Sequence, residues 1–267
     1  VCGINFGGGK GVINLKGIKK TSDLYESYGE LVDQLNNTYI TAGDVGTSME
    51  DLISINKTTK YVGGIKLETS APTAKGIFNA INTTFKFLTN KELKESTIAI
   101  SGVGKVGSKL SKLLFERNAN LIVSNIGRDA IDQLKLDKIS FNEYDINSIF
   151  EQKCDIISPC ALGGVINSET KKKLKCKAIV GAANNQLDKS ETSLWLKENN
   201  IFYAPDYLVN SGGVIAISCE INNSEDTLDN QLNKISDKVL SLLKESKKSN
   251  LSTDKIVEDL AWKRINI

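Results

Sequence analysis

The chain has 267 residues, enough for about two domains of ordinary size, and 40% hydrophobic with 25% charged residues is the balance of a soluble globular protein. This composition excludes a disordered, collagen-like or coiled-coil chain. The 34 Lys and Arg residues exceed the 32 Asp and Glu residues too little to indicate a nucleic-acid partner, and the absence of histidine excludes His-dependent triads and His-ligated metal sites.

The first 75 residues are predicted to form two short strands and two helices. Apolar residues recur at helical spacing through residues 21–35. A second helix is expected over residues 48–55, with Ser48 as its cap and Asp51 placing negative charge in its first turn. The strand-like segments are residues 11–15 and 39–42.

From residue 74 onward, helical and strand-like segments alternate, which indicates a parallel β-sheet covered by helices. The predicted helices are residues 74–89 and 105–116, and the strand candidates are residues 97–101, 120–124, 155–158, 178–181 and 202–204. The tail has two amphipathic segments, 228–243 and 253–262, separated by a Lys- and Ser-rich turn at 244–252. These tail helices have no strand partner, so we expect them to pack back on the first domain.

A glycine-rich turn lies directly between a predicted strand and a predicted helix, where Gly102, Gly104 and Gly107 form a GxGxxG pattern. In such a turn the first glycine allows the tight bend and the second lets a pyrophosphate approach the backbone. The third lets helix and strand pack closely. In this context the pattern predicts dinucleotide binding, and a purely structural glycine turn is the alternative.

The end of the second strand bears on the choice of dinucleotide. An Asp or Glu usually stands there and binds the ribose 2′-hydroxyl, but this chain has Asn125, with Arg128 three residues later. An amide still bonds a hydroxyl, yet it does not repel a 2′-phosphate, and Arg128 can pair with one. An exposed loop arginine is the other interpretation of Arg128. We therefore expect NAD as cofactor, with NADP possible.

Two charged residues stand in glycine-rich loops. Lys10 has glycines at positions 7, 8, 9 and 11, and glycine in such number often marks close approach of the backbone to a ligand. Asp44 lies between Gly43 and Gly46, on the loop before the second helix. In a chain without histidine, Lys10 and Asp44 are candidates for a proton relay, and the alternative is two ordinary turn residues.

The five cysteines are scattered and form no CxxC pair, which indicates neither a disulfide framework nor a zinc site. We therefore expect a chain of the reducing cytoplasm, without a bound metal. No apolar run reaches the ~20 residues of a membrane span, and no signal-peptide pattern opens the chain, so no membrane partner is expected. The sequence starts at Val1 rather than Met and runs at once into a glycine cluster, so we expect it to be cut at its N-terminus.

Several blocks of the sequence, in order and over nearly the whole chain, resemble the Glu/Leu/Phe/Val dehydrogenases, and leucine dehydrogenase most closely. The blocks are residues 3–10, 39–47, 102–107, 158–163, 183–187 and 203–214. The resemblance implies an α/β protein with a Rossmann-like dinucleotide-binding domain and a partial α/β substrate domain. We expect residues 75–240 to form the Rossmann-like domain, and residues 1–74, with the C-terminal helix 241–267 packing back, to form the partial substrate domain.

The resemblance also implies roles for individual residues. Lys10 matches the lysine that activates the water attacking the imino carbon, and Asp44 matches the aspartate that shuttles protons. Cofactor contacts are implied for residues in and around the glycine turn, namely Thr73, Gly102, Gly104, Lys105, Val106, Gly107, Asn125, Arg128, Ala161 and Asn184. Substrate contacts are implied for Ala42, Asn185, Val214 and Ile217.

The matching side-chain positions of the substrate pocket are all apolar: Ala42, Val214 and Ile217. A second carboxylate buried there without a cation would cost several kcal/mol. We therefore expect a branched aliphatic L-amino acid as substrate, deaminated oxidatively and reversibly to its 2-oxo acid and ammonium.

Family members have a further lysine upstream of the glycine–lysine loop, which binds the substrate carboxylate, and this chain begins after it. The chain is therefore expected to be a fragment or a shortened homologue. Two other interpretations stay open: a non-catalytic NAD(P)-binding remnant and an unrelated Rossmann reductase. The family forms homo-oligomers, so we expect one here as well.

Overall fold

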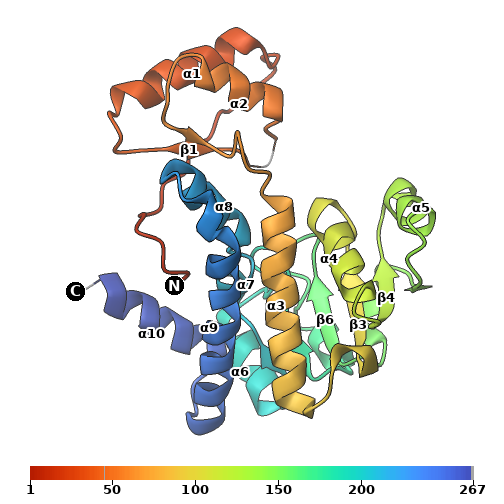
Figure 1. Ribbon diagram of the computed structural model, residues 1–267. Helices are drawn as coiled ribbons and strands as arrows, with labels where there is room; N and C mark the ends of the chain where they lie inside the picture. Colours follow the sequence, from red (N-terminus) through yellow and green to blue (C-terminus); the bar gives the residue numbers. More distant parts are fainter. Residues whose placement is uncertain (45, 266–267) are drawn as a thin grey trace. The chain divides into compact units, whose positions relative to one another are not determined.

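The computed structural model describes residues 1–44 and 46–265 (Figure 1). The chain divides into two compact units. We call them the sheet unit, which consists of Val1–Cys2, Ser70–Gly213 and Asp229–Ile267, and the small unit, which consists of Gly3–Thr69 and Val214–Leu228. Within the described residues, no helix combines the length and the apolar character that a membrane crossing requires.

The sheet unit is built on six strands that all run parallel, in the order β5-β4-β3-β6-β7-β8. The strands are β3 (Thr97–Ser101), β4 (Asn120–Ser124), β5 (Asn142–Glu143), β6 (Ile156–Pro159), β7 (Ala178–Ile179) and β8 (Phe202–Tyr203). Counted from β3, this is the 3-2-1-4-5-6 order of a Rossmann fold, whose two halves meet between β3 and β6. The predicted parallel α/β architecture is confirmed.

Helices flank this sheet on both faces, as its apolar strands require. They are α3 (Ser70–Thr89), α4 (Lys105–Phe115), α5 (Arg128–Leu136), α6 (Ser190–Glu198), the short α7 (Asp206–Val209), α9 (Leu228–Lys248) and α10 (Thr253–Ile265). Ile98, Ile100 and Ile157 of the central strands are completely buried. The long helices α3 and α9 run side by side in Figure 1, and Asn79 of α3 donates a hydrogen bond to the carbonyl oxygen of Leu232 on α9.

The small unit contains the helices α1 (Ser22–Gln34) and α2 (Met49–Asn56) and the two parallel strands β1 (Thr41–Ala42) and β2 (Val62–Gly63). Most of α8 (Gly212–Ile221) also belongs to it. The helix starts follow from local capping. The Thr21 side chain accepts a hydrogen bond from the backbone of α1, and Ser48 and Asp51 form a reciprocal capping box on α2. Tyr25, Leu52, Ile55 and Val62 form the core of the unit.

Some of the expectations differ from the structure. Residues 11–15 form no strand, because Val12 is 82% exposed and no neighbouring strand pairs with this segment. Helix α3 begins at Ser70 rather than at 74, since Pro72 lies in the first turn, where its missing N–H costs nothing. Helix α9 continues to Lys248, so the link to α10 is shorter than residues 244–252.

The C-terminal helices lie in the sheet unit, whereas we expected them to pack on the first domain. Helix α10 contacts α6 and β8, and its buried Ile256 and Val257 explain this placement. The sequence pattern predicts none of the helices α5, α6, α7 and α8. In α5 only Ile131 and Leu134 are buried, too few apolar residues for a clear helical pattern. The predicted domain boundaries at residues 74, 240 and 241 stay predictions.

Candidate functional site

The glycine-rich turn has a backbone that only glycine fits. Gly102 has a φ of +99°, and its N–H donates to the carbonyl oxygen of Ser124 over 2.8 Å. A Cβ on Gly102 would lie 2.6 Å from the Cβ of Ala161, which follows β6. The turn therefore sits against the loop of the other half of the sheet, at the point where a Rossmann fold binds its ligand.

The other two glycines differ in what surrounds them. A Cβ on Gly107 would overlap the carbonyl oxygen of Gly102, so helix α4 can approach β3 only because this position is glycine. Around Gly104, by contrast, no atom lies within 4 Å of an added Cβ. Gly104 is the N-cap of α4 and supplies no side-chain cap, and Lys105 and Val106 form the start of the helix. The N-terminal N–H groups of α4 thus face open space that fits a dinucleotide pyrophosphate.

The side chain of Asn125 forms two hydrogen bonds within this turn. Its Oδ1 accepts the N–H of Val103 over 3.0 Å, and its Nδ2 donates to the carbonyl oxygen of Gly127 over 2.8 Å. Asn125 therefore holds the glycine turn to the end of β4.

Arg128 starts α5 and forms ion pairs with two carboxylates, Glu143 on β5 and Asp132 in the next turn. Lys135 binds the other oxygen of Glu143 over 3.3 Å. Partial desolvation raises the pKa of Glu143, but the hydrogen bonds and positive charges of Lys135 and Arg128 outweigh it, so this pKa lies below its ordinary value. The carboxylate of Glu143 is thus ionised and surrounded by cations at neutral pH.

The loops after β6 and β7 meet at the same edge of the sheet. A Cβ on Gly163 would lie 2.6 Å from the carbonyl oxygen of Asn184, and Asn185 has a φ of +52°. The side-chain oxygen of Asn184 accepts a hydrogen bond from Asn210 over 2.7 Å. The N–H of Asn185 donates to Asp206 over 2.7 Å. Both predicted asparagines are therefore held in place by side chains at the end of β8.

Asp206 is a residue that the sequence did not single out. Its carboxylate is buried, and it accepts hydrogen bonds from the N–H of Asn185 and from the hydroxyl of Tyr203. Burial and the nearby Asp206 carboxylate raise the pKa of Tyr203, which keeps the phenol protonated as a donor. The available signal was its place within residues 203–214, one of the blocks that carry the family resemblance.

Thr73 lies at the beginning of α3, beside the start of α8. A Cβ on Gly212 would lie 2.8 Å from the Cα of Thr73 and would overlap the carbonyl oxygen of Pro72. This close approach explains the glycine at position 212. Thr73 is thereby placed beside the segment that follows Asn210.

In the small unit, Lys10 and Asp44 form an ion pair. The side chain of Lys10 is 69% exposed and that of Asp44 is 48% exposed, so both charges have access to water. Asp44 stands at the start of a turn closed by Thr47, whose hydroxyl accepts the N–H of Asp44 over 2.7 Å and whose N–H donates to the carbonyl oxygen of Asp44. The pair that the sequence suggested is therefore brought together by the fold.

A cavity of about 350 Å³ adjoins this ion pair within the small unit. Lys10, Asp44 and Ala42 all line it, together with Tyr25 and Tyr28. The Tyr28 hydroxyl lies 3.2 Å from the hydroxyl of Thr41, and Tyr39 accepts the N–H of Gly11. Three of the predicted site residues thus share one pocket with apolar and hydroxyl-bearing walls.

Val214 and Ile217 stand on α8, away from the lining of that cavity. Ile217 packs on β2, since a Cβ on Gly63 would lie 2.6 Å from its Cγ2. Gly63 is the register partner of Ala42 on β1. Ala42, Gly63 and Ile217 therefore form a continuous small and apolar surface, whereas Val214 is exposed.

Glu220 on α8 is a second buried carboxylate that the sequence did not single out. Its two oxygens accept the N–H groups of Ile65 and Leu67, each over 3.0 Å. These bonds fix the segment after β2 to α8 and, with it, the position of Gly63 against Ile217.

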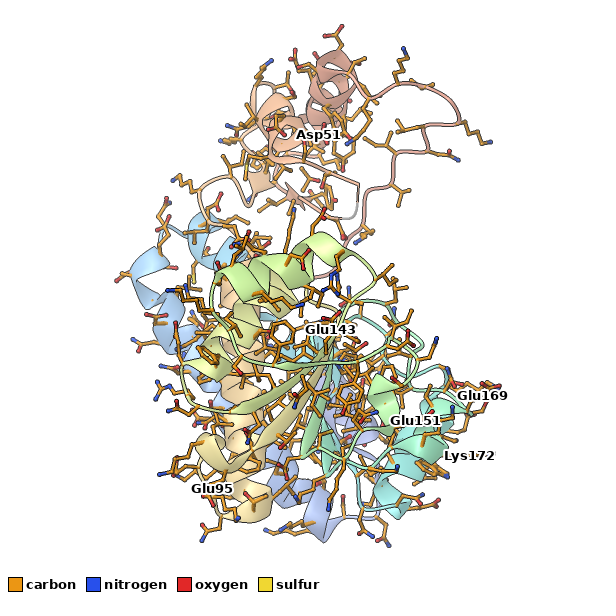
Figure 2. All side chains as sticks on the ribbon, turned by 90° about the vertical axis from the view of Figure 1, so that its right-hand side faces the viewer. Asp51, Glu95, Glu143, Glu151, Glu169 and Lys172 are labelled. Atoms are coloured by element: carbon orange, nitrogen blue, oxygen red, sulfur yellow. The ribbon has the colours of Figure 1, made fainter. Side chains whose placement is uncertain are left out.

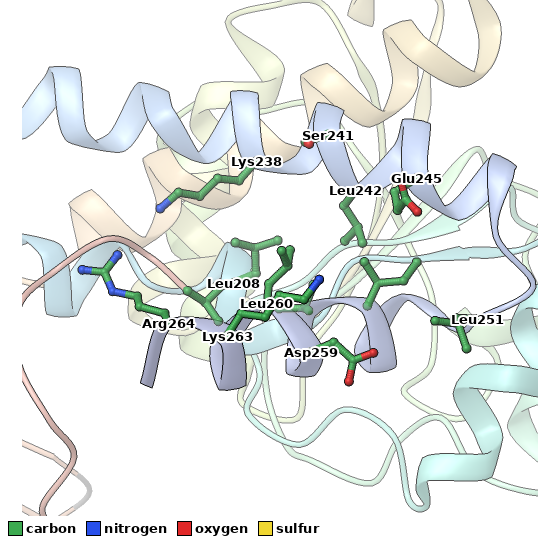
Figure 3. A pocket seen from close by; sticks show the side chains of 13 residues that line it. Leu208, Lys238, Ser241, Leu242, Glu245, Leu251, Asp259, Leu260, Lys263 and Arg264 are labelled. Atoms are coloured by element: carbon green, nitrogen blue, oxygen red, sulfur yellow. The ribbon is translucent and has the colours of Figure 1, made fainter. Parts of the chain in front are cut away.

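A further cavity, of about 600 Å³, lies in the sheet unit between α9 and α10 (Figure 3). Apolar residues such as Leu242 and Leu260 line it, with Lys238 and Asp259 at its rim. Burial lowers the pKa of Lys238. None of the predicted site residues lines this cavity.

The sequence pattern that describes the Glutamate/Leucine/Phenylalanine/Valine dehydrogenases matches residues 63–259. The chain belongs to this family. The match includes the glycine turn, both asparagines and α8, and the N-terminal segment with Lys10 and Asp44 precedes it.

Several amino-acid dehydrogenases are similar to this chain over most of its length. The chain is 37% identical to a phenylalanine dehydrogenase of Thermoactinomyces intermedius, over 98% of this chain and 74% of the relative. It is 40% identical to a leucine dehydrogenase of Bacillus subtilis (strain 168), over 82% of this chain and 62% of the relative. The crystal structure of L-tryptophan dehydrogenase from Nostoc punctiforme is similar with a TM-score of 0.81 and 33% identity, and the match covers 93% of this chain and 73% of that one. The chain thus spans about two thirds to three quarters of the length of these amino-acid dehydrogenases.

Proposed function

We propose that this protein catalyses the reversible oxidative deamination of an apolar L-amino acid to its 2-oxo acid and ammonium, with a nicotinamide dinucleotide as hydride acceptor. The observation that carries the proposal is the Lys10–Asp44 ion pair beside Ala42 in one cavity, in a member of a dehydrogenase family. A lysine and a carboxylate supply the acid and base that this chemistry needs in a chain without histidine.

The bound cofactor supplies the acceptor for the hydride that leaves the α-carbon of the amino acid. The remaining chemistry belongs to the small unit. Lys10 is the base that takes a proton from the water that attacks the imino carbon. Asp44, in direct contact with Lys10, passes protons between that amine and the departing ammonia. Because both side chains are open to water, the excess proton of the forward reaction can leave to solvent.

The proposed cofactor is NAD, with NADP possible. The glycine turn and the open N-terminus of α4 fit the pyrophosphate that both cofactors share. The residues proposed to bind the cofactor are Thr73, Gly102, Gly104, Lys105, Val106, Gly107, Asn125, Ala161 and Asn184, and Arg128 is proposed as a contact for the 2′-phosphate of NADP. Arg128 is engaged by two carboxylates, and this favours the cofactor without a 2′-phosphate.

The proposed substrate is a branched aliphatic amino acid, bound by Ala42, Asn185, Val214 and Ile217. The apolar surface of Ala42, Gly63 and Ile217 offers no charge to a second carboxylate, which disfavours glutamate. The names of the relatives, which include leucine, phenylalanine and tryptophan dehydrogenases, agree with an apolar side chain. We further propose a cytoplasmic homo-oligomer, in keeping with the five free thiols and the family.

The test is the oxidation of NADH with ammonium and 4-methyl-2-oxopentanoate, repeated with NADPH and with 2-oxoglutarate. We expect turnover that depends on ammonium, prefers NADH and fails with 2-oxoglutarate. NADH binding without any turnover would replace this proposal with that of a cofactor-binding remnant. Turnover that survives both Lys10→Ala and Asp44→Asn would indicate an unrelated reductase instead.

A further inference from the structure

A cluster of charges on β5 and α5 surrounds the residue that could recognise a 2′-phosphate. The guanidinium of Arg128 pairs through Nη1 with Glu143 and through Nε, over 3.3 Å, with Asp132. Glu143 also binds Lys135, so its carboxylate joins two cations from the same helix. These contacts could not be predicted from the sequence, because Glu143 follows Arg128 by 15 residues on a two-residue strand.

The position of Glu143 in the sheet matters for the direction in which Arg128 points. Glu143 is the register partner of Val123 on β4, two residues before Asn125. At about 3.3 Å per residue, this lies roughly 7 Å behind the carboxyl edge of the sheet, where Rossmann folds bind the ribose of the adenosine. The ion pair therefore engages the guanidinium of Arg128 with a residue whose Cα lies at this level of the sheet.

The charge balance works in the same direction. Asn125, at the usual carboxylate position, carries no charge that would repel a phosphate, and both groups of its amide already hold the glycine turn. The preference for NAD proposed above must then depend on other charges in the neighbourhood. Glu143 supplies such a charge and also occupies the one arginine that starts α5.

We propose that Glu143 is a specificity-determining residue that makes this protein prefer NAD over NADP by holding Arg128 away from the 2′ position. Loss of its negative charge releases Arg128 to pair with the 2′-phosphate, so that the preference weakens or reverses. The inference rests on the proposed function only in so far as the chain binds a nicotinamide dinucleotide.

The experiment measures the dissociation constants of NADH and NADPH for the full chain by fluorescence, without substrate and without turnover. Glu143→Gln is expected to tighten NADPH binding by about twofold to fivefold, the upper part of the range for one exposed ion pair, while NADH binding stays unchanged. Glu143→Asp keeps the charge and should retain most of the preference. This gain in NADPH affinity should decrease as the salt concentration rises, because salt screens interactions between exposed charges.

Two further variants isolate the proposed contact. Glu143→Gln combined with Arg128→Gln should lose the gain in NADPH affinity, because the released guanidinium is then absent. Glu151→Gln is the matched control: Glu151 also pairs with a lysine, Lys173, at a similar exposure in the same unit, and both glutamates are labelled in Figure 2. This control should leave the ratio of the two affinities unchanged.

The outcomes separate the two proposals. If the unmodified chain binds neither NADH nor NADPH, the proposed function itself fails. If it binds NADH but Glu143→Gln leaves the affinity ratio unchanged, or changes it no more than Glu151→Gln, the role of Glu143 is refuted while the proposed function stands. A gain that persists without Arg128 would also overturn the inference.

Discussion

The apolar side chains of Ile98, Ile100 and Ile157 on the central strands of the sheet unit are completely buried, whereas a core cluster of the small unit is formed by Tyr25, Leu52, Ile55 and Val62 on two helices and the two-stranded sheet. Their candidate sites differ in the same way. In the sheet unit, glycines and buried polar groups set the shape of the turn at the sheet edge. In the small unit, Lys10 and Asp44 are exposed charges on loops. The proposed cofactor binding thus depends mainly on steric fit, and the proposed chemistry depends on two side chains.

The sharpest test of this difference is Lys10→Met. Removal of an acid–base group is expected to lower kcat by about 10²–10⁴-fold, while the dissociation constant for NADH stays within error, since the glycine turn belongs to the other unit. Single-turnover kinetics and fluorescence titration on the same sample give both quantities. Lys19→Met, at an exposed lysine of the small unit, is the control. Equal losses in both variants, or a loss of NADH binding with Lys10→Met, would contradict the division of roles.

The second test concerns steric fit in the sheet unit. Gly107→Ala places a methyl group on the carbonyl oxygen of Gly102 and should destabilise the unit by about 1–3 kcal/mol through overpacking. NADH binding should weaken as well, because the turn must shift. Thermal unfolding and NADH titration measure the two effects.

Gly104→Ala is the matched variant, since nothing lies within 4 Å of its added Cβ. Its thermal stability should stay close to that of the parent chain, while NADH binding should weaken because the methyl group occupies the space of the pyrophosphate. If both alanine variants unfold at the same temperature, the packing role of Gly107 is wrong.

The parts of the fold that depend on neighbouring residues could be predicted from the sequence. The strands β3 and β4 agree with the predicted residues, as do the Ser48 cap and the glycine turn. The ion pair of Lys10 and Asp44 brings together two residues that the sequence had selected on separate loops. Local capping, apolar runs and turn residues carry this information because their partners lie within a few residues.

The buried polar contacts could not be predicted in this way. Asp206 holds a backbone group 21 residues away, and Glu220 holds one 155 residues away. A carboxylate in a helix normally indicates a solvent-exposed face, so neither residue stands out before the loops are folded. The strand predicted at residues 11–15 is wrong because an apolar run alone does not form a strand. It also needs a neighbouring strand with which it can pair.

A third prediction uses Glu220 in the small unit. In Glu220→Gln only one oxygen remains to accept the N–H groups of Ile65 and Leu67, and we expect a loss of about 1–2 kcal/mol in local stability. Hydrogen exchange at these two amides should accelerate accordingly, with little change in the sheet unit. The control is Asp226→Asn, which changes an exposed carboxylate a few residues after α8. Unchanged exchange at Ile65 and Leu67 would show that the segment is held by other contacts.

The smallest expected effect concerns Asp51, which is labelled in Figure 2. Desolvation raises its pKa, but hydrogen bonds from Lys20 and from the N–H of Ser48 outweigh this, so the pKa in the folded chain lies below the ordinary value of 3.8. The stabilisation from the ionised carboxylate is therefore complete above that pH and is lost as the pH falls through the lower, folded pKa. Asp51→Asn should cost about 0.5–1 kcal/mol at pH 7, and this difference from the parent chain should shrink in stronger acid.

Urea unfolding at pH 7 and at pH 3 measures this difference, and Asp23→Asn provides the comparison, since Asp23 lies exposed in the first turn of α1. Because Asp51 closes a capping box and also binds Lys20, its substitution should cost more than that of Asp23 at pH 7. An equal cost for both would mean that the charge in the first turn, rather than the capping box, stabilises α2. A cost that grows as the pH falls would reverse the assigned direction of the pKa shift, since the carboxylate would then stabilise the folded chain in its protonated form.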